Sequence, residues 1–258
     1  MKRTTIAERL ETGADVLGAR TVTMSPSMVE VYGHLGLDFT WLDFEHCGGS
    51  PSDSDLLERY TRAADVADVD LLVRLPQGDP SLVRKVLDTG VRTLLVPQVE
   101  RPGDIRPAIE ASRFTYDGAP GTRGSGIGRD NVWTAEIPDD VDEVDSEIAV
   151  GCMIETRTAV ENVEEILSVP GLGFVVIGPS DLSISYGHPF DRDHPEVRDA
   201  IDTVREACLD ADVPVGGVTD DTDDARTKLD EGYRLLRVGD EVSSARTVLG
   251  ERLDTLTD

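Results

Sequence analysis

Ionisable side chains crowd the end of one short apolar run near the start of the chain. In DFTWLDFEHC, residues 38–47, an aromatic stretch is followed by Asp43, Glu45 and His46. Histidine is suited to act as a general base because its ordinary pKa lies close to neutrality, and we expect Asp43 to hold the imidazole of His46 in one tautomer. A structural, hydrogen-bonded histidine is the competing interpretation. Cys47 is a poor candidate nucleophile, since successive residues of an extended chain point apart.

Three further polar groups end later apolar runs: Arg74 in LLVRLP, Glu155 in GCMIE and Asp181 in VVIGPSD. A guanidinium at the end of a buried strand needs an anion, so Arg74 either pairs with a carboxylate or stabilises a developing oxyanion. Two neighbouring carboxylates repel each other, so Glu155 and Asp181 would share a proton or bind a hard cation such as Mg²⁺ or Mn²⁺. The competing interpretation makes Asp181 the N-cap of the helix LSISYG, whose free amides would also bind a substrate carboxylate.

Short apolar runs alternate with longer amphipathic segments along the whole chain. The runs are DVLGARTVTM, FTWLDFEH, DLLVRLP, TLLVPQV, IAVGCMIET, GFVVIGPSD, VPVGGVT and LLRVGDE. Near-continuous apolar strands separated by helices indicate an α/β protein with a covered parallel sheet. Eight strand–helix pairs favour a (β/α)8 TIM barrel in a single domain, residues 1–258, although the weak first run leaves an open sheet as the alternative. In such a barrel the strand ends described above would meet at one mouth.

Residues that favour helix ends agree with this division. The expected N-caps are Ser25 or Ser27, Asp79 and Thr222, and the expected C-terminal glycines are Gly36, Gly90 and Gly232.

One Gly-rich segment, residues 114–138, breaks the alternation. Loops this long inside compact domains are usually functional or interfacial. We therefore expect an ordered loop near the active face or at a subunit contact. Arg123 would then contact the active site or the neighbouring subunit. Its GSGIG is a poor phosphate-binding signature, because no strand runs directly into it and no lysine follows.

The chain is strongly acidic: 25 basic and 51 acidic residues give a net charge of −26. Such a surface argues against nucleic-acid and membrane partners. Dispersed acidic residues and only three lysines suggest a halophilic source, with an ordinary acidic cytosolic protein as the alternative. The polar N-terminus is unlike a signal peptide, and the scattered Cys47, Cys152 and Cys208 are too few for a disulfide framework or a zinc site. We expect a cytoplasmic protein.

The positions of the lysines exclude one type of barrel chemistry. A Schiff-base aldolase needs a lysine near a strand end on the inner face. Lys2 is terminal, and Lys85 and Lys228 fall within the predicted helices SLVRKVLD and DDARTKLDEG.

The motifs GLDFTWLDFEH, VRLP, VLDTGVRTLLVPQVE, APGTRGSG, IET, GFVVIGPSDLS and HPEVRDAI occur in this order between about residues 5 and 253. Together they resemble the metal-dependent, pyruvate-using HpcH/HpaI aldolases, whose fold is a barrel of the phosphoenolpyruvate/pyruvate type. The resemblance implies reversible cleavage of a 4-hydroxy-2-oxo acid to pyruvate and an aldehyde through a pyruvate enolate held by the metal. It also implies Mg²⁺ or Mn²⁺, with Co²⁺ as a third candidate, small-molecule substrates only, and a homo-oligomer, often a hexamer.

The same resemblance implies a role for each matching position. Glu155 and Asp181 would bind the metal, Arg74 would stabilise the enolate oxygen, and His46 would take the hydroxyl proton during cleavage. The implied supporting residues are Asp88, which would raise the basicity of His46 across a subunit interface, Asp43, which would line the site, and Gly178, Pro179, Ser180 and Met153, which would lie around the substrate.

Three positions depart from the family pattern. Met153 replaces a usual glutamine, Phe44 replaces a small residue, and Arg20 stands near a position that is often aromatic. These changes leave the implied metal ligands and base intact but leave the aldehyde partner open. Two alternatives follow: a related lyase of the citrate lyase beta-subunit or malyl-coenzyme A type, for which the chain lacks an evident basic groove, and a non-catalytic metal-binding oligomeric barrel.

Overall fold

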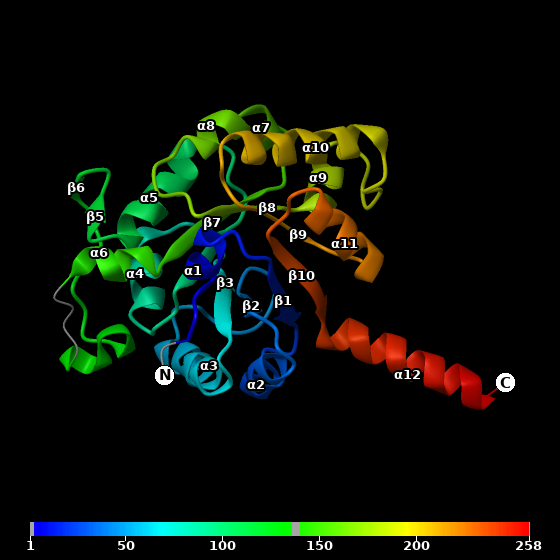
Figure 1. Ribbon diagram of the computed structural model, residues 1–258, viewed down its shortest axis with the longest axis horizontal. Coiled ribbons are helices and arrows are strands. Elements are labelled where there is room, and N and C mark those ends of the chain that lie inside the picture. Colours follow the sequence, from blue (N-terminus) through cyan, green and yellow to red (C-terminus); the bar gives the residue numbers. More distant parts are fainter. Residues whose placement is uncertain (1–2, 136–139, 258) are drawn as a thin grey trace.

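The computed structural model describes residues 3–135 and 140–257, and its centre is a closed barrel of parallel strands (Figure 1). The strands of the barrel pair in the ring order β1-β10-β9-β8-β7-β4-β3-β2, with β2 pairing back to β1. Their bounds are β1 Val16–Thr21, β2 Phe39–Asp43, β3 Asp70–Arg74, β4 Thr93–Val96, β7 Ala149–Ile154, β8 Phe174–Ile177, β9 Val215–Val218 and β10 Leu235–Asp240. The predicted barrel is confirmed, and the open sheet is excluded because the weak first run pairs on both sides.

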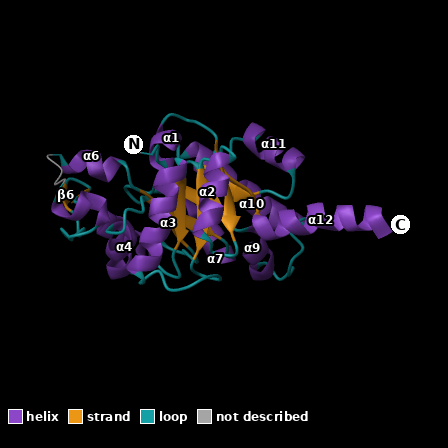
Figure 2. Cartoon of the chain, turned by 90° about the horizontal axis from the view of Figure 1, so that it is seen from below, coloured by secondary structure: helices purple, strands orange, loops and turns teal. Residues whose placement is uncertain are grey.

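Helices lie between successive strands and surround the barrel, except α12, which follows the last strand (Figure 2). They are α2 Pro26–His34, α3 Ser54–Ala67, α4 Pro80–Leu87, α5 Pro102–Ser112, α6 Val141–Ser146, α7 Arg157–Glu161, α8 Val163–Leu167, α9 Pro179–Ser185, α10 Pro195–Asp210, α11 Thr222–Asp230 and α12 Glu241–Thr257. A short helix before the barrel, α1 Ile6–Glu11, was not predicted; its Ile6 and Leu10 join the apolar cluster inside the barrel. Among the described residues, no helix combines the length and apolar character needed to cross a membrane.

The barrel interior is filled by large side chains that face glycines. Phe39 lies against Gly18 on the neighbouring strand, and a Cβ added to Gly18 would come within 2.4 Å of the ring. Phe174 and Gly151 repeat the arrangement on β8 and β7, again at 2.4 Å. Native interiors tolerate no such overlap, so the packing of the barrel interior requires glycine at both positions.

The helix ends mostly follow the prediction. Asp79 caps α4 by accepting the amide of Leu82 at 2.9 Å, and Ser25 occupies the N-cap of α2 without a side-chain hydrogen bond. Gly36, Gly90 and Gly232 all have the positive φ angles of helix C-termini. The prediction of Thr222 as an N-cap is wrong by one residue. The N-cap of α11 is the preceding Asp221, which accepts the amides of Asp223 and Asp224.

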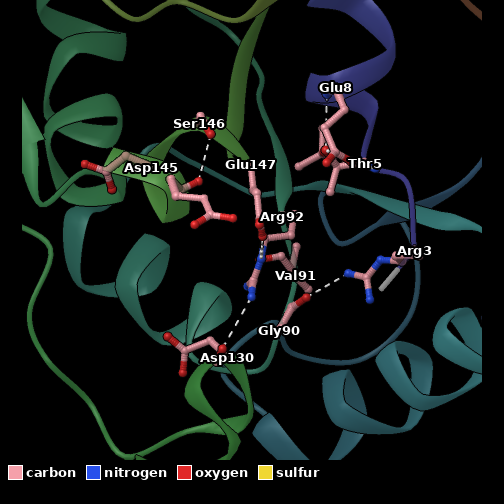
Figure 3. Close-up of polar contacts among 12 residues, drawn as sticks. Arg3, Thr5, Glu8, Gly90, Val91, Arg92, Asp130, Asp145, Ser146 and Glu147 are labelled. Carbon is pink, nitrogen blue, oxygen red and sulfur yellow. Dashed lines mark hydrogen bonds and ion pairs between the residues drawn. The ribbon is translucent and has the colours of Figure 1, made fainter. Parts of the chain in front are cut away.

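The Gly-rich loop lies at the N-terminal end of the barrel. It contains the hairpin β5 Thr115–Tyr116 and β6 Ala119–Pro120 and the 3-10 helix η1 Arg129–Thr134. Figure 3 shows its surroundings: the Arg3 guanidinium donates to the carbonyl of Gly90 at 2.8 Å, and Arg92 reaches the carbonyl of Asp130. Arg3 also pairs with Asp70, the first residue of β3.

Arg123 lies among these contacts at the N-terminal end of the barrel, and not at the mouth. Its Nη2 donates to Asp130 at 3.1 Å, and its guanidinium stacks over the ring of Phe114. The expectation of a loop near the active face is therefore wrong for the described residues 114–135, while a subunit contact stays a prediction. Residues 136–138 of the predicted loop lie outside the described part.

The last helix, α12, projects away from the barrel (Figures 1 and 2). None of its described residues is buried. Its first residue, Glu241, ties the base of the helix to the end of β1, because its carboxylate accepts the amides of Val22 and Thr23 at 3.1 and 2.7 Å. Hydroxyl groups of Thr21, Thr23 and Tyr32 add three further hydrogen bonds.

Glu241→Gln is expected to lower the free energy of unfolding by about 1–3 kcal/mol, since several charge-assisted hydrogen bonds are lost. Burial alone would raise the pKa of Glu241, but the hydrogen bonds from Thr23 and Val22 outweigh it and lower the pKa to about 2. This carboxylate therefore stabilises the fold above its ordinary pKa and loses that contribution as pH falls toward about 2. Urea unfolding at pH 7 measures the change, with Glu251→Gln on the exposed part of α12 as the control; equal stability of the two variants would contradict it.

Candidate active site

Asp43 and Arg74 form a buried ion pair at the C-terminal ends of β2 and β3. The two residues are partners in the strand register. Arg74 donates from Nε to Oδ1 of Asp43 at 2.9 Å and from Nη2 to Oδ2 at 2.5 Å. Burial alone would raise the pKa of Asp43, but the hydrogen bonds and charge of Arg74 outweigh it and hold the pKa below its usual value. The pair fixes the guanidinium plane at the mouth.

A tight turn after β2 positions Glu45 and His46. Both backbone amides donate to Oδ1 of Asp43, at 3.1 and 3.3 Å. The imidazole Nε2 of His46 lies 3.5 Å from Oε2 of Glu45, and Nη1 of Arg74 lies 2.8 Å from the same oxygen. The expectation that Asp43 orients the imidazole is wrong, because Asp43 is fully engaged with Arg74 and the turn; Glu45 is the neighbouring carboxylate. The His46 side chain is 61% exposed and lies beside Glu45.

Glu155 is a buried carboxylate just after β7. Its Oε1 accepts the backbone amide of Gln98 at 2.6 Å, and the Gln98 side chain donates to Glu45 at 3.1 Å. Burial and the charges of Glu45 and Asp181 raise the pKa of Glu155 to about 7. The hydrogen bond from the Gln98 amide and the charge of Arg74 lower this pKa, but their effect is smaller. Such an environment favours either a proton or a cation.

Gln98 has a structural role that the sequence did not reveal. It lies just after β4, and its backbone takes a positive φ of 54°. Non-glycine residues in this region are uncommon and strained. The strained turn aims the Gln98 amide at Glu155, and only the folded backbone shows this.

Asp181 approaches Glu155 from the first turn of α9. The N-cap of α9 is Gly178, so the interpretation of Asp181 as the N-cap is wrong. A Cβ on Gly178 would lie 2.9 Å from the Cβ and 3.0 Å from Oε2 of Glu155, so glycine is required for this close approach. Pro179 and Ser180 follow at the start of the same helix.

Glu155 and Asp181 fit a hard divalent cation that has few protein ligands. Their like charges face one another without a cationic side chain bonded to Glu155 among the described contacts. Over residues 3–135 and 140–257, no group of three or more metal-ligating side chains is found. Water and substrate oxygens would therefore have to complete the coordination, as is common for Mg²⁺.

Two of the sequence departures have clear structural positions. Met153 lies inside the barrel, and its sulfur accepts a hydrogen bond from Nη1 of Arg74 at 3.6 Å. Phe44 packs in the core between the barrel and the helices. Phe44 therefore serves packing and does not face the mouth.

Asp88 lies at the opposite end of the molecule from His46. It is the C-cap of α4, where Gly126 of the loop packs against its carboxylate and its carbonyl accepts the amide of Asp130. Within one chain the structure brings together Asp43, His46, Arg74, Met153, Glu155, Gly178, Pro179, Ser180 and Asp181 at the mouth, but not Asp88.

Comparison with known proteins agrees with this fold and gives the family. Residues 21–247 match the family model described as HpcH/HpaI aldolase/citrate lyase. A hydroxypyruvate/pyruvate aldolase of Cupriavidus necator is 34% identical over 218 residues, which cover 84% of this chain and 79% of that protein. A 2-keto-3-deoxy-L-rhamnonate aldolase of Klebsiella pneumoniae is 32% identical over 241 residues, covering 93% of this chain and 88% of that protein. The crystal structure of an HpcH/HpaI aldolase/citrate lyase family protein from Burkholderia cenocepacia superposes with a TM-score of 0.90 and 32% identity, covering 98% and 99% of the two chains.

The chain therefore belongs to the HpcH/HpaI aldolase/citrate lyase family. It is an enzyme of the aldolase type, a carbon–carbon lyase on a TIM-type barrel, as the sequence motifs predicted.

Proposed function

We propose that the enzyme reversibly cleaves a 4-hydroxy-2-oxo acid to pyruvate and an aldehyde with the help of Mg²⁺ or Mn²⁺, Co²⁺ being a third candidate. The observation that carries this proposal is the buried Glu155, with its pKa raised to about 7, next to Asp181 and in the field of Arg74. A carboxylate pair of this kind, at the same mouth as a fixed guanidinium, suits an anionic substrate whose negative charge grows during reaction.

Glu155 and Asp181 would hold the cation. When bound, the cation supplies Lewis-acid stabilisation of negative charge on oxygen atoms of the pyruvate moiety. The backbone around Ser180 and Asp181 would hold the pyruvate carboxylate, and Gly178 lets this backbone approach Glu155 closely. Pro179 and Met153 would line the same space.

Arg74 would stabilise the oxygen that becomes negative when the carbon–carbon bond breaks. Its two bonds to Asp43 leave Nη1 on the side of Met153 and Glu45. His46 would take the proton from the substrate hydroxyl, since its imidazole is the exposed titratable group beside Glu45. In the reverse direction the same imidazole would return that proton to the new alkoxide.

The methyl protons of pyruvate test this proposal directly. Reversible removal of a methyl proton is expected to exchange them for deuterium in D₂O, at a rate that depends on Mn²⁺ or Mg²⁺ and falls to background with a chelator. Proton NMR of the methyl signal follows the exchange. A wild-type enzyme that binds metal and pyruvate but gives no exchange above background would contradict the proposal.

We further infer a homo-oligomer, with a hexamer as the family resemblance implies. Support comes from α12, whose exposed apolar side chains recur at helical spacing: Val242, Val248, Leu249, Leu253 and Leu256. An apolar stripe on a projecting helix is typical of a contact with another chain. In such an assembly Asp88 of one chain could approach His46 of another, which would explain its distance from His46 within a chain.

Leu249→Glu combined with Leu253→Glu is expected to reduce the mass of the particle, because charges would replace the centre of the apolar stripe. Thr255→Glu, elsewhere on the same helix, is the matched control. Light scattering after size exclusion gives both masses. An unchanged mass in the double variant would show that α12 does not hold the assembly together.

A further inference from the structure

Two arginines, Arg20 on β1 and Arg237 on β10, face the interior of the barrel at its mouth. Successive side chains of a strand alternate between the two faces. Val16 belongs to the cluster inside the barrel and Gly18 faces Phe39 there, so Arg20 continues the inward row of β1. Leu235 belongs to the same interior cluster, which makes Arg237 the next inward residue of β10.

Neither guanidinium has the close partner that Arg74 has. Nη1 of Arg20 is 3.7 Å from Oδ2 of Asp43, and its Nη2 is 4.0 Å from Oδ2 of Asp240. Nη1 of Arg237 is 3.9 Å from that same oxygen of Asp240. Charge-assisted hydrogen bonds are about 2.7–2.9 Å long. All three pairs are therefore loose, and both carboxylate oxygens of Asp43 already accept hydrogen bonds from Arg74.

Part of each guanidinium is buried without a hydrogen-bond acceptor. The Nε atoms of Arg20 and Arg237 are both inaccessible to solvent and find no partner among the described residues. The side chains as a whole stay 29% and 20% exposed, so their outer nitrogens reach the mouth. Burial and the charge of Arg20 lower the pKa of Arg237. Two like charges that share one carboxylate would be stabilised by a second anion.

The ring order of the strands separates this arginine pair from the carboxylate pair. Counting from β7, which carries Glu155, the neighbours are β8, β9, β10 and then β1. In a ring of eight strands, β1 is thus directly across from β7. A substrate whose pyruvate end lies near Glu155 would extend its other end toward Arg20 and Arg237.

We propose that Arg20 and Arg237 bind a second carboxylate, carried by the aldehyde part of the substrate. This assignment rests on the proposed function and adds to it two residues that determine specificity. Arg20 and Arg237 would favour an aldehyde that is itself an acid over a neutral aldehyde. A planar carboxylate accepts two parallel hydrogen bonds from one guanidinium, which is the geometry that the loosely paired arginines leave free.

The test measures condensation with pyruvate for matched aldehydes that differ in the carboxylate: glyoxylate against glycolaldehyde, and succinic semialdehyde against butanal. The wild-type enzyme is expected to favour the acid of each pair in kcat/KM by about tenfold or more. Arg20→Gln and Arg237→Gln are each expected to reduce this preference about 10- to 100-fold, and Arg20→Lys is expected to retain part of it. Arg62→Gln, an exposed arginine of α3, is the control and should keep the wild-type preference.

Deuterium exchange into pyruvate distinguishes a failure of the arginine assignment from a failure of the proposed function. Exchange by the wild type with no preference for the acids, or a preference that survives both glutamine variants, overturns the arginine assignment alone. Absence of exchange in the wild type overturns the proposed function and the assignment with it. Loss of exchange in a glutamine variant to the same degree as loss of condensation would assign that arginine to the pyruvate end, against this inference.

Discussion

Glu155→Gln is expected to lower kcat/KM for pyruvate release by about a thousandfold or more, because Lewis-acid stabilisation of developing charge is worth several kcal/mol. Glutamine preserves the size of the side chain and can still accept the Gln98 amide, which is 2.6 Å from the carboxylate. The substitution therefore removes the negative charge and leaves the packing against Gly178 in place. Asp181→Asn should show a loss in the same direction.

The matched control is Glu164→Gln, which removes a charge from the exposed surface of α8. Its activity and its affinity for Mn²⁺, measured by calorimetry, should equal those of the wild type. Full metal-dependent activity in Glu155→Gln would contradict the assignment of Glu155 as a ligand.

The affinity for Mn²⁺ should also depend on pH through Glu155. Burial and the nearby carboxylates raise the pKa of this group to about 7. Below that pH the cation must displace a proton, so the apparent affinity should fall about tenfold per pH unit. Above pH 7 the affinity should level off. A flat affinity between pH 6 and 8 would contradict this expectation.

Arg74→Lys is expected to lower kcat by about 10²–10³-fold, the usual effect of removing one donor from a developing oxyanion. Lysine keeps the positive charge but cannot make the two parallel bonds that Arg74 makes to Asp43. The negative charge of the fully buried Asp43 would then be compensated less well by its cationic partner. A lower melting temperature should therefore accompany the loss of activity.

A comparison of kcat with KM distinguishes catalysis from substrate binding. If Arg74 acts on charge that develops during bond cleavage, kcat and kcat/KM should fall by similar factors. A rise in KM with kcat unchanged would instead assign Arg74 to ground-state binding. Arg62→Lys on the exposed face of α3 controls for a general effect of replacing arginine.

The strands and the mouth were predictable because their signals are local. An apolar run rich in branched residues predicts a covered strand whatever surrounds it, and a polar residue at its end then falls at the mouth. This reasoning brought Asp43, Arg74 and Glu155 together correctly. The motif resemblance added the family, which the match over residues 21–247 confirms.

The contacts within the mouth were less predictable because they depend on register and on turns. Asp43 pairs with Arg74 through the β2–β3 register, which leaves Glu45 as the carboxylate beside His46. Gln98 has a positive φ, which aims its amide at Glu155. The sequence gives no sign of this conformation, because the residue is not a glycine. Arg20 was noted only as a departure from a family pattern. Its relation to Arg237, far along the chain, appears only when the barrel closes.

The most direct test of the account is pyruvate release coupled to lactate dehydrogenase, in an assay validated at high salt. The substrates are 4-hydroxy-2-oxo diacids and 2-keto-3-deoxy sugar acids, each with Mn²⁺ and with a chelator. We predict release that requires the metal, disappears in His46→Ala, and is fastest with the diacids. No release from any substrate, while metal and pyruvate still bind, would contradict an aldolase acting on these compounds.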